Sequence, residues 1–423
     1  MATFKNMWIL AVLVFGSLQA EAKIEVLFHP TDPTLEKVAE WFDAAHGQID
    51  ISMYSMDTTA GSPVMKKLME PAMQARLKSG ELSIRMIFEG YGTKPENEKK
   101  MADLEAVGID ARFMKSGKMV HHKFAVIDPG ASDARLITGS ANWSASSYRG
   151  YDENMLFMEQ EPEAIVSFET EFTSLWDSAE EYGVTLKHSA RATPSVPSGL
   201  DHMDVFFNSM RVLFKQDTPE TYLASHVERL IANAKSEVLI ATTRIRLESL
   251  LGAVKSAAAR GVKVKILISQ DDYHDLYKRA DSLFNQPNLE LRIKFYNLKP
   301  SQYITYQMHN KFLIVDREEI GTGSYNWSDS SENGHVENFI ELKSSGARDV
   351  MSSYLARFEM LWDRGRAEFP AYTESLTQKK ARGELPACGF APTSLSYEEV
   401  RALLKLAPKC GATSAAPSSG EGE

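Results

Sequence analysis

Short apolar stretches recur along this chain in the same order twice. The first half has IEVLF at 24–28, IDISMYSM at 49–56 and LSIRMIF at 82–88, which are rich in the residues that favour strands. The second half repeats the series at 203–207 (MDVFF), 237–245 (EVLIATTRI) and 262–268 (VKVKILI). Strands that alternate with helical patterns predict two similar α/β halves with covered sheet faces.

Each half continues with one more apolar run and one amphipathic segment. The runs KFAVID (123–128) and KFLIVD (311–316) are predicted to be buried strands. The amphipathic segments end in Leu-Trp-Asp, at 175–177 and 361–363, and are predicted to be helices. The duplication therefore extends over most of the chain.

Composition marks the boundaries between these parts. An apolar stretch from Met7 to about Phe15, followed by Ala20-Glu21-Ala22, predicts a cleaved signal peptide and hence an exported, periplasmic or secreted protein; an uncleaved anchor is the alternative. The segment rich in Ser, Pro, Ala and Gly before the second half reads as a linker. The predicted division is signal peptide 1–22, first domain 23–182, linker 183–202, second domain 203–375 and C-terminal extension 376–423 with a disordered tail.

The 423 residues suffice for two domains, and 43% hydrophobic with 25% charged residues is typical of a soluble globular protein. A net charge of −10 argues against a generally sticky nucleic-acid binder, because such proteins are usually basic. A local basic funnel for DNA or an anionic lipid headgroup remains open, as does an ordinary solvated face. The basic residues concerned are Arg112, Lys115, Lys118 and Lys123 before the first motif strand, and Lys294 and Lys299 before the second.

Cys388 and Cys410 are the only two cysteines in the sequence. In an exported protein such a pair is consistent with a disulfide, and two free thiols are the competing interpretation. A metal site is not expected from so few ligands. Both residues lie outside the repeated region, so we expect at most a structural role.

The pattern His-x-Lys-x₄-Asp opens each of the two apolar runs. The first copy is His121, Lys123 and Asp128, and the second is His309, Lys311 and Asp316. Each copy is followed by Gly-Ser-x-Asn-Trp and then by Glu-Asn. The additional residues of this kind are Ser140, Asn142 and Glu153 in the first half, and Ser324, Asn326 and Glu337 in the second.

The spacing of the two copies is conserved except in one loop. Asn and Glu are eleven residues apart in both halves (142 to 153, 326 to 337), whereas Asp and Gly are eleven apart in the first and seven in the second (128 to 139, 316 to 323). A turn can absorb this difference. Two complete sets are therefore predicted, and both look competent.

The residue types suit phosphate chemistry. In a strand, residues two apart share a face, so the His and Lys of each motif project together. The Asp, seven residues after the His, points away or lies beyond the strand and fits a supporting role. Lysines and asparagines can bind and orient a phosphate, and a Glu can fix the tautomer of a His. His122 falls on the opposite face and is expected to be packed or solvated, and Trp143 and Trp327 are expected in the core.

These motifs resemble those of the phospholipase D superfamily over roughly residues 23–370. The resemblance implies an α/β fold of two similar halves, each a mixed β-sheet flanked by helices, related by a pseudo-twofold axis. It also implies one shared active site without metal or cofactor, where one His attacks phosphorus and the other protonates the leaving oxygen. The implied nucleophile is one of His121 and His309, with a preference for His121. The side chains implied to bind phosphate oxygens are Lys123, Lys311, Asn142 and Asn326, with minor contacts from Ser140 and Ser324. The implied supporting residues are Asp128, Asp316, Glu153 and Glu337.

The resemblance thus predicts a phosphodiesterase that works through phosphohistidine, and we expect a monomer. HHKF followed by GSxNW is closest in style to the branch of bacterial endonucleases and mitochondrial cardiolipin hydrolases. The acidic charge and the expected export favour phospholipid headgroup release, with peripheral membrane contact, whereas the local lysines favour a nuclease. Transfer to an alcohol in place of water and a catalytically silent module that binds phosphate-rich surfaces are further alternatives.

Overall fold

The computed structural model describes residues 23–89, 95–114, 117–183, 202–273, 283, 286–296, 306–384 and 392–408. The expected signal peptide, nearly all of the expected linker, both cysteines, Lys115 and Lys299 lie outside the described residues. What the sequence predicts for these segments and residues therefore stays a prediction.

The first half is built on a mixed sheet of nine described strands, one of which, β14 (Gln307–Met308), comes from the second half. β2, β3 and β4 run parallel to one another, and their other neighbours are antiparallel. In spatial order the main strands are β1 (Lys23–His29), β8 (Tyr151–Glu159), β7 (Arg135–Gly139), β6 (Lys123–Ile127), β2 (Gln48–Met53), β3 (Ser83–Phe88), β4 (Ile109–Phe113) and β9 (Glu180–Glu181).

The second half repeats this order in an eight-stranded sheet of described residues. The strands are β10 (Met203–Phe207), β18 (Asn338–Lys343), β16 (Glu319–Gly323), β15 (Lys311–Val315), β11 (Glu237–Thr242), β12 (Lys263–Ser269), β13 (Leu289–Phe295) and β19 (Thr393–Ser396). Strand by strand, position and direction match the first sheet. The predicted fold class of two similar α/β halves with mixed sheets is confirmed.

Helices cover the outer face of each sheet and bury a separate apolar core there. In α8, for example, buried Leu223, Val227, Leu230 and Ile231 recur with helical spacing and form one apolar stripe. The first sheet carries α1 (Thr34–Asp43), α2 (Pro63–Leu68), α3 (Pro71–Ser79) and α4 (Pro95–Ala106); the second carries α8 (Leu223–Asn233), α9 (Glu248–Ala259), α14 (Phe369–Ala381) and α15 (Tyr397–Leu406).

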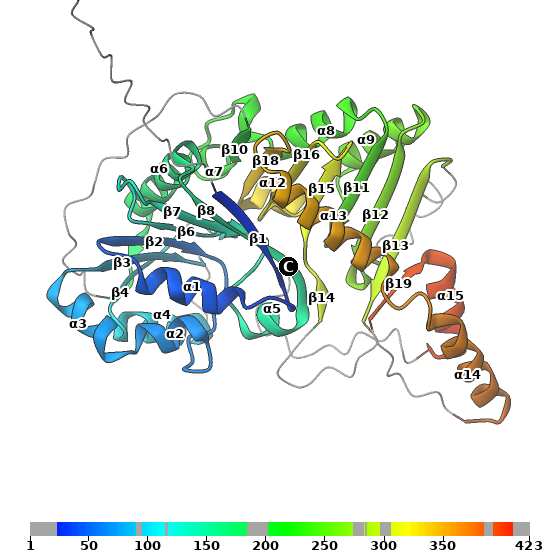
Figure 1. The fold of residues 1–423 in the computed structure, drawn as a ribbon, viewed down its shortest axis with the longest axis horizontal. Coiled ribbons are helices and arrows are strands. Elements are labelled where there is room, and N and C mark those ends of the chain that lie inside the picture. The colour runs from blue at the N-terminus through cyan, green and yellow to red at the C-terminus, as the bar shows by residue number, and fades with distance from the viewer. Residues whose placement is uncertain are drawn as a thin grey trace, which may run out of the picture.

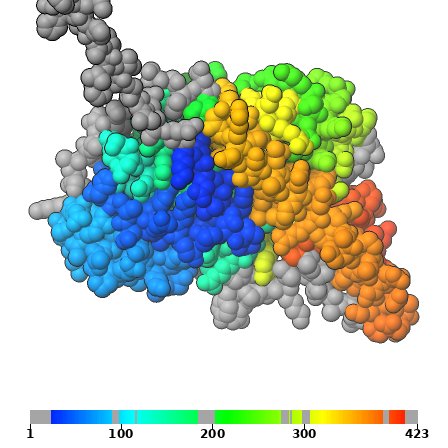
Figure 2. Space-filling view, viewed as in Figure 1, coloured from blue at the N-terminus to red at the C-terminus, as the bar shows by residue number. Residues whose placement is uncertain are grey.

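A third core lies between the halves and joins them. It contains the apolar faces of the two helices that end in Leu-Trp-Asp, α6 (Pro162–Ser178) and α13 (Arg348–Asp363), together with strand residues from both sheets. In Figures 1 and 2, β1 of the first half lies directly beside α13 of the second. The molecule is thus held together by a continuous apolar layer between its two sheets.

Short elements fill the connections near the middle of the molecule. Those that matter below are β5 (Met119–Val120) and β17 (His335–Val336), which form a small parallel ladder, and the helices α5 (Ala145–Gly150) and α12 (Asp329–Gly334). The remaining short helices are α7 (Ser209–Val212), η1 (Pro219–Thr221) and η2 (Gln270–Asp272). Within the described part of the chain, no helix combines the length and apolar character needed to cross a membrane.

Two details differ from the expected elements. β2 and β11 end earlier than their apolar runs, because the chain continues as single bridges, Met56 to Trp143 and Ile245 to Trp327. The expected boundary at residue 375 falls inside α14. Beyond it, β19 pairs with β13 and α15 contributes to the second outer core, so the described part of the C-terminal extension is packed on the second domain.

Candidate active site

Two short parallel ladders bring the motifs of the two halves together. β5 ends just before His121 and pairs with β17, which ends just before Glu337. β14 ends just before His309 and pairs with the start of β8, just before Glu153. The backbone N–H of each His donates, at 3.0 Å, to the carbonyl of the residue that precedes the opposite Glu. Each motif histidine therefore lies beside the glutamate of the other half.

His121 is held by Glu337. Its Nδ1 lies 2.8 and 2.9 Å from the two carboxylate oxygens, and both side chains are buried. The hydroxyls of Ser324 (2.6 Å) and Ser331 donate to the same carboxylate. Burial alone would raise the pKa of Glu337, but attraction and hydrogen bonding by His121 hold it below its usual range. An ionised Glu337 fixes the proton of His121 on Nδ1 and leaves Nε2 as the nitrogen that can serve a substrate.

His309 is held by Glu153 in the corresponding way, through its Nδ1. The second oxygen of Glu153 lies 3.3 Å from Nδ1 of His29 and accepts from Ser147. Burial alone would raise the pKa of Glu153, but its contacts with His309 and His29 hold it below its usual range. Burial and the charge of Lys311 lower the pKa of His309 to about 4, against the attraction of Glu153. His309 is therefore neutral near pH 7.

The two motif lysines lie next to their histidines, as the strand alternation predicts. Nζ of Lys123 donates to the carbonyl of His121 at 2.6 Å, and Nζ of Lys311 lies 3.0 Å from both the carbonyl and Nε2 of His309. Both lysines are buried. Because an ammonium group only donates, Nε2 of His309 must be the acceptor in this contact, so it carries no proton.

Asn142 and Asn326 follow β7 and β16 on tight turns. The preceding glycines, Gly139 and Gly323, have φ values of 140° and 142°, and a Cβ on either would lie 2.5 Å from the carbonyl oxygen of Asn154 or Asn338. Only glycine fits there. Oδ1 of Asn142 has no hydrogen-bond partner among the described residues, and Asn142 lines the pocket described below.

The motif aspartates lie at the far end of the motif strands, away from the histidines. Each has a positive φ (49° at Asp128, 51° at Asp316) and accepts three backbone N–H groups at 2.8–2.9 Å from the segment that enters β2 or β11. The two aspartates therefore stabilise the fold and do not contact the histidines of their motifs.

Ser140 and Ser324 were expected to contact phosphate, but they lie behind the site. Both are fully buried, and their hydroxyls accept the backbone N–H of Asn154 and Asn338 at 3.0 Å. The hydroxyl of Ser324 also binds Glu337. The two serines thus bind the segments that carry the glutamates, because the Gly-Ser turn packs against the strand residue after the Glu.

The residue after each motif histidine makes a further contact with the other half of the molecule. His122 is fully buried, donates from Nε2 to the carboxylate of Glu171 at 3.0 Å and accepts at Nδ1 from the amide of Asn338 at 3.1 Å. Asn310, its counterpart, accepts from the amide of Asn154 at 3.0 Å. His122 is therefore packed, as its position on the opposite face predicts. Trp143 and Trp327 are fully buried core residues.

A narrow pocket lies where the two motifs meet. Its lining residues come from both halves: Tyr54, His121, Asn142, Tyr151, Arg244, Gln307 and His309. The ring of Tyr54 meets His121 edge-on at 4.8 Å, and that of Tyr151 is 5.5 Å from His309. The free volume for water-sized molecules is about 10 Å³. A phosphate group is larger than this free volume, so side chains around the pocket must move before one can enter.

Sequence reasoning missed several residues of this site. Tyr54, Tyr151 and Arg244 lie outside the repeated motifs. The matching position in the other half holds a different residue in each case, so the duplication gives no signal for them. His29 follows the first apolar strand, where the pairing of β1 with β8 places it opposite Glu153. Only the register of these strands reveals that contact.

None of the four described residues named for the basic funnel lines the pocket between the motifs. Lys294 is fully buried, with Nζ unpaired among the described residues, and burial lowers its pKa to about 7. Arg112 donates to the carbonyl of Trp176 and lies over its ring, and Lys118 donates to the carbonyl of Asn333. Of these residues, Lys123 alone is placed beside a motif histidine. Arg244 adds a cation that the sequence did not single out.

Two groups of described residues have donor atoms close enough together for a metal ion, within 4.8 Å of one another. One is His121, His335 and Glu337, and the other is Glu105, Asp110 and Glu181. In the first group a metal would have to replace the hydrogen bond between His121 and Glu337.

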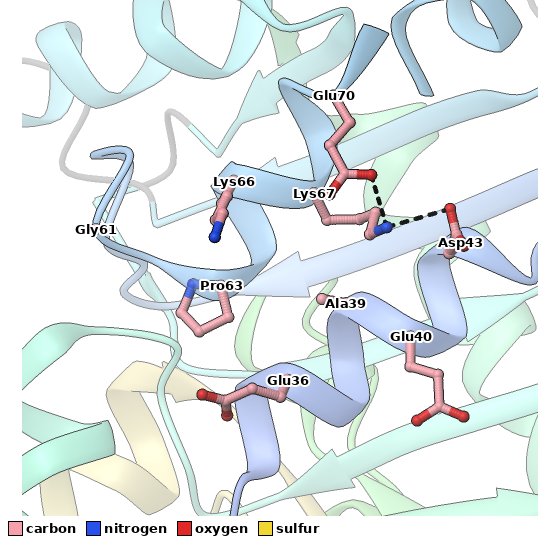
Figure 3. A pocket seen from close by; sticks show the side chains of 9 residues that line it. All are labelled: Glu36, Ala39, Glu40, Asp43, Gly61, Pro63, Lys66, Lys67 and Glu70. Atoms are coloured by element: carbon pink, nitrogen blue, oxygen red, sulfur yellow. Dashed lines mark hydrogen bonds and ion pairs between the residues drawn. The ribbon is translucent and has the colours of Figure 1, made fainter. Parts of the chain in front are cut away.

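A larger surface hollow lies between α1 and α2, away from the motif residues (Figure 3). Its charged side chains already pair in part: Lys67 lies 2.7 Å from Glu70 and 3.5 Å from Asp43. None of the motif residues lines it. The chemistry predicted from the sequence therefore belongs to the narrow pocket.

Comparison with known proteins agrees with this architecture. The family model described as "Cardiolipin synthase, PLD-like domain" matches residues 38–176 and 227–362, more than half of the chain. A mitochondrial cardiolipin hydrolase of Danio rerio is 35% identical over 85 residues, 20% of this chain and 35% of that protein. A cardiolipin synthase of Halalkalibacterium halodurans is 24% identical over 345 residues, 75% of this chain and 64% of that protein.

Among solved structures, phosphatidylserine synthase of Haemophilus influenzae has the same fold, with a TM-score of 0.57 at 11% identity over 79% of this chain and 85% of that one. The chain spans about a third of the zebrafish hydrolase. The repeated motifs, the two matching sheets and the family model, which covers both halves, lead to one conclusion: this chain belongs to the PLD-like domain family of the phospholipase D superfamily.

Proposed function

We propose that this protein hydrolyses phosphodiesters at the pocket between its two halves, through a phosphohistidine. The observation that carries the proposal is the meeting of the two motif histidines in one pocket, each with its Lys beside it and each bound to a Glu of the other half. Such an arrangement supplies a nucleophile, a general acid and cations for the phosphate oxygens.

The two histidines need different protonation states for this reaction. The nucleophile must be neutral, and the acid must carry a proton on Nε2. The family resemblance favours His121 as nucleophile, but the contact of Lys311 with Nε2 of His309 supports His309 in that role, because Nε2 there is an unprotonated acceptor. His121 would then protonate the leaving oxygen and afterwards activate water.

The bound phosphate would be held by the cations and amides around the two histidines. Lys123 and Lys311 would move from their histidines to phosphate oxygens, and the amides of Asn142 and Asn326 would orient the group. Arg244 lies on one side of the pocket only, since Ser55 occupies its position in the first half. It is therefore suited to an anionic or polar part of the substrate on that side.

For the substrate we propose a phospholipid, with headgroup release as the reaction. The names of the family and of the relatives, which are cardiolipin synthase and cardiolipin hydrolase, support a lipid. A nuclease acting by the same mechanism is the alternative, and transfer to an alcohol needs only that an alcohol replace water. Export, membrane contact and a monomeric state stay predictions.

The test uses purified protein in EDTA with three substrates: cardiolipin-containing vesicles, single-stranded DNA and double-stranded DNA, each with and without an added alcohol. We expect lipid turnover that EDTA does not affect. His121→Ala and His309→Ala should each reduce the rate by at least about 1,000-fold, since each removes a whole catalytic group.

His122→Asn is the matched control, because asparagine stands at its counterpart, Asn310. It should keep a rate near that of the natural protein. Turnover of DNA alone would select the nuclease, and loss of activity in EDTA would exclude the mechanism. A near-normal rate in either alanine variant would exclude a shared site.

A further inference from the structure

The two half-sites differ at a fully buried residue beside each glutamate, in addition to the difference between Tyr151 and His335. β1 places His29 opposite Glu153, and Asn208 follows β10 at the corresponding position beside Glu337. The side chain of Asn208 bonds to backbone: it donates to the carbonyl of His335 at 2.9 Å and accepts the N–H of Glu337 at 2.8 Å. His29 instead reaches the carboxylate itself. The duplication is therefore unequal at this point.

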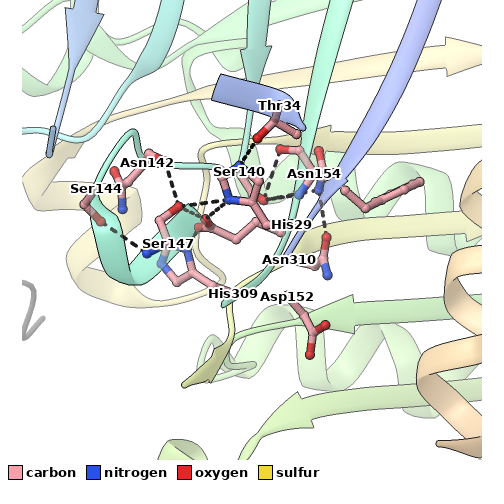
Figure 4. Close-up of polar contacts among 12 residues, drawn as sticks. His29, Thr34, Ser140, Asn142, Ser144, Ser147, Asp152, Asn154, His309 and Asn310 are labelled. Atoms are coloured by element: carbon pink, nitrogen blue, oxygen red, sulfur yellow. Dashed lines mark hydrogen bonds and ion pairs between the residues drawn. The ribbon is translucent and has the colours of Figure 1, made fainter. Parts of the chain in front are cut away.

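His29 is completely buried and fixed on both ring nitrogens. Nδ1 lies 3.3 Å from Glu153 and 3.2 Å from the hydroxyl of Ser147, and Nε2 contacts the hydroxyl of Thr34 (Figure 4). The titratable and polar groups that face it from the surrounding elements are Thr34 on α1, Ser147 and Tyr148 on α5, Glu153 on β8 and Arg357 on α13; Arg357 also pairs with Asp152 at 3.0 Å.

Glu153 thus lies between two imidazoles, with His309 on one oxygen and His29 on the other. A carboxylate whose charge is already shared with one donor attracts a proton on a second group less strongly. Glu337 also has a second imidazole near it, but at a greater distance: Nδ1 of His335 is 3.7 Å from the oxygen that His121 approaches to 2.8 Å, whereas Nδ1 of His29 is 3.3 Å from Glu153.

We propose that His29 is a positioning residue that makes the two catalytic histidines unequal: by binding Glu153 it keeps His309 in its neutral form, ready to attack phosphorus. His29 does not touch the pocket and acts through Glu153. The inference rests on the proposed function, because the protonation state of His309 matters for catalysis only if this histidine attacks phosphorus. Pairs of groups pushed to different protonation states are how such sites assign these roles.

The test is His29→Asn, which copies the residue of the second half. Without His29, Glu153 binds the proton of His309 more strongly, so the pKa of His309 rises. As the pH is lowered, His309 is then protonated earlier and can no longer attack phosphorus. The acid limb of kcat/KM should therefore move up by roughly one pH unit. His29→Gln restores an N–H donor to Glu153 without an imidazole and should keep the limb near its natural position.

The titration of His309, followed by ¹⁵N NMR in substrate-free protein and assigned with His309→Ala, is an independent readout. An unchanged titration and pH profile in His29→Asn would overturn the inference, as would an equal shift in His29→Gln and His29→Asn. Should His29→Asn fail to fold, Asn208→His is the reverse test and should lower the pKa of His121.

The two proposals can fail separately. If the natural protein turned over no diester in the experiment above, the proposed function would fail, while the NMR titration would still test the effect of His29 on His309. If the natural protein is active but the titration ignores His29, the inference alone fails.

Discussion

At the scale of single residues, the site consists of buried polar groups that are held by fixed partners. His121, His309, Glu153 and Glu337 are almost fully buried, and a charge in such a place persists only when it is paired. The pairing is crossed between the halves, so each carboxylate controls the histidine of the other motif. The residue types could be predicted from the motifs, but the crossing could not, because each glutamate follows the Asn of its own half by eleven residues and this spacing does not say which histidine the glutamate meets.

Replacing either glutamate tests the crossing. Glu337→Gln removes the anion beside His121, so the pKa of His121 should fall while the titration of His309 stays in place; Glu153→Gln should do the opposite. Either change should also lower kcat by about 100-fold or more, since a mis-set tautomer disables the imidazole. The measurement is ¹⁵N NMR titration of both histidines, each variant serving as the control for the other. A response of His309 to Glu337→Gln would refute the crossing.

At the scale of elements, strand ends position the chemistry. Each motif strand, β6 or β15, begins at the Lys, two residues after the His, and the Asp follows its last residue, where the chain turns with positive φ. Strand alternation predicted the common face of His and Lys and the separate position of Asp. It could not predict what the aspartates bind, because the N–H groups that they accept come from about 80 residues earlier in the chain.

Asp316→Ala tests the role of the aspartates. It leaves several backbone N–H groups without their acceptor, and we expect a loss of about 2 kcal/mol in the free energy of unfolding at pH 7. Burial alone would raise the pKa of Asp316, but hydrogen bonds from Glu237, Ser236 and Lys235 lower it to about 2. Because the pKa of Asp316 is lower in the folded state than in the unfolded chain, its ionised form stabilises the folded protein above pH 3.8. This stabilisation is lost as the pH falls toward 2. The difference between variant and natural protein should therefore shrink over that range.

Urea unfolding at pH 7 and pH 3 measures this difference. Asp133→Ala, at an exposed position, is the control and should leave the free energy of unfolding nearly unchanged. An Asp316→Ala variant as stable as the natural protein at pH 7 would show that these hydrogen bonds do not hold the turn.

At the scale of the whole molecule, two sheets with the same strand order face each other across a shared core. The repeated apolar runs predicted the strands and the two halves, and the helices ending in Leu-Trp-Asp were found where expected. The integration of β19 and α15 into the second half could not be predicted, since the repeat pattern has no counterpart of α15. The short ladders that join the motifs were also missed, because two-residue strands leave no periodic signal.

The most direct test of the central claim, one site made by both halves with a covalent histidine, is to trap the intermediate. The protein is mixed with a diester that carries ³²P at the scissile phosphate, quenched in alkali and digested, and the labelled peptide is identified by mass spectrometry. We expect one label per chain, on His309, and none in His309→Ala. Label on His121 would reverse the two roles, and label on neither histidine in a turning-over enzyme would contradict the account.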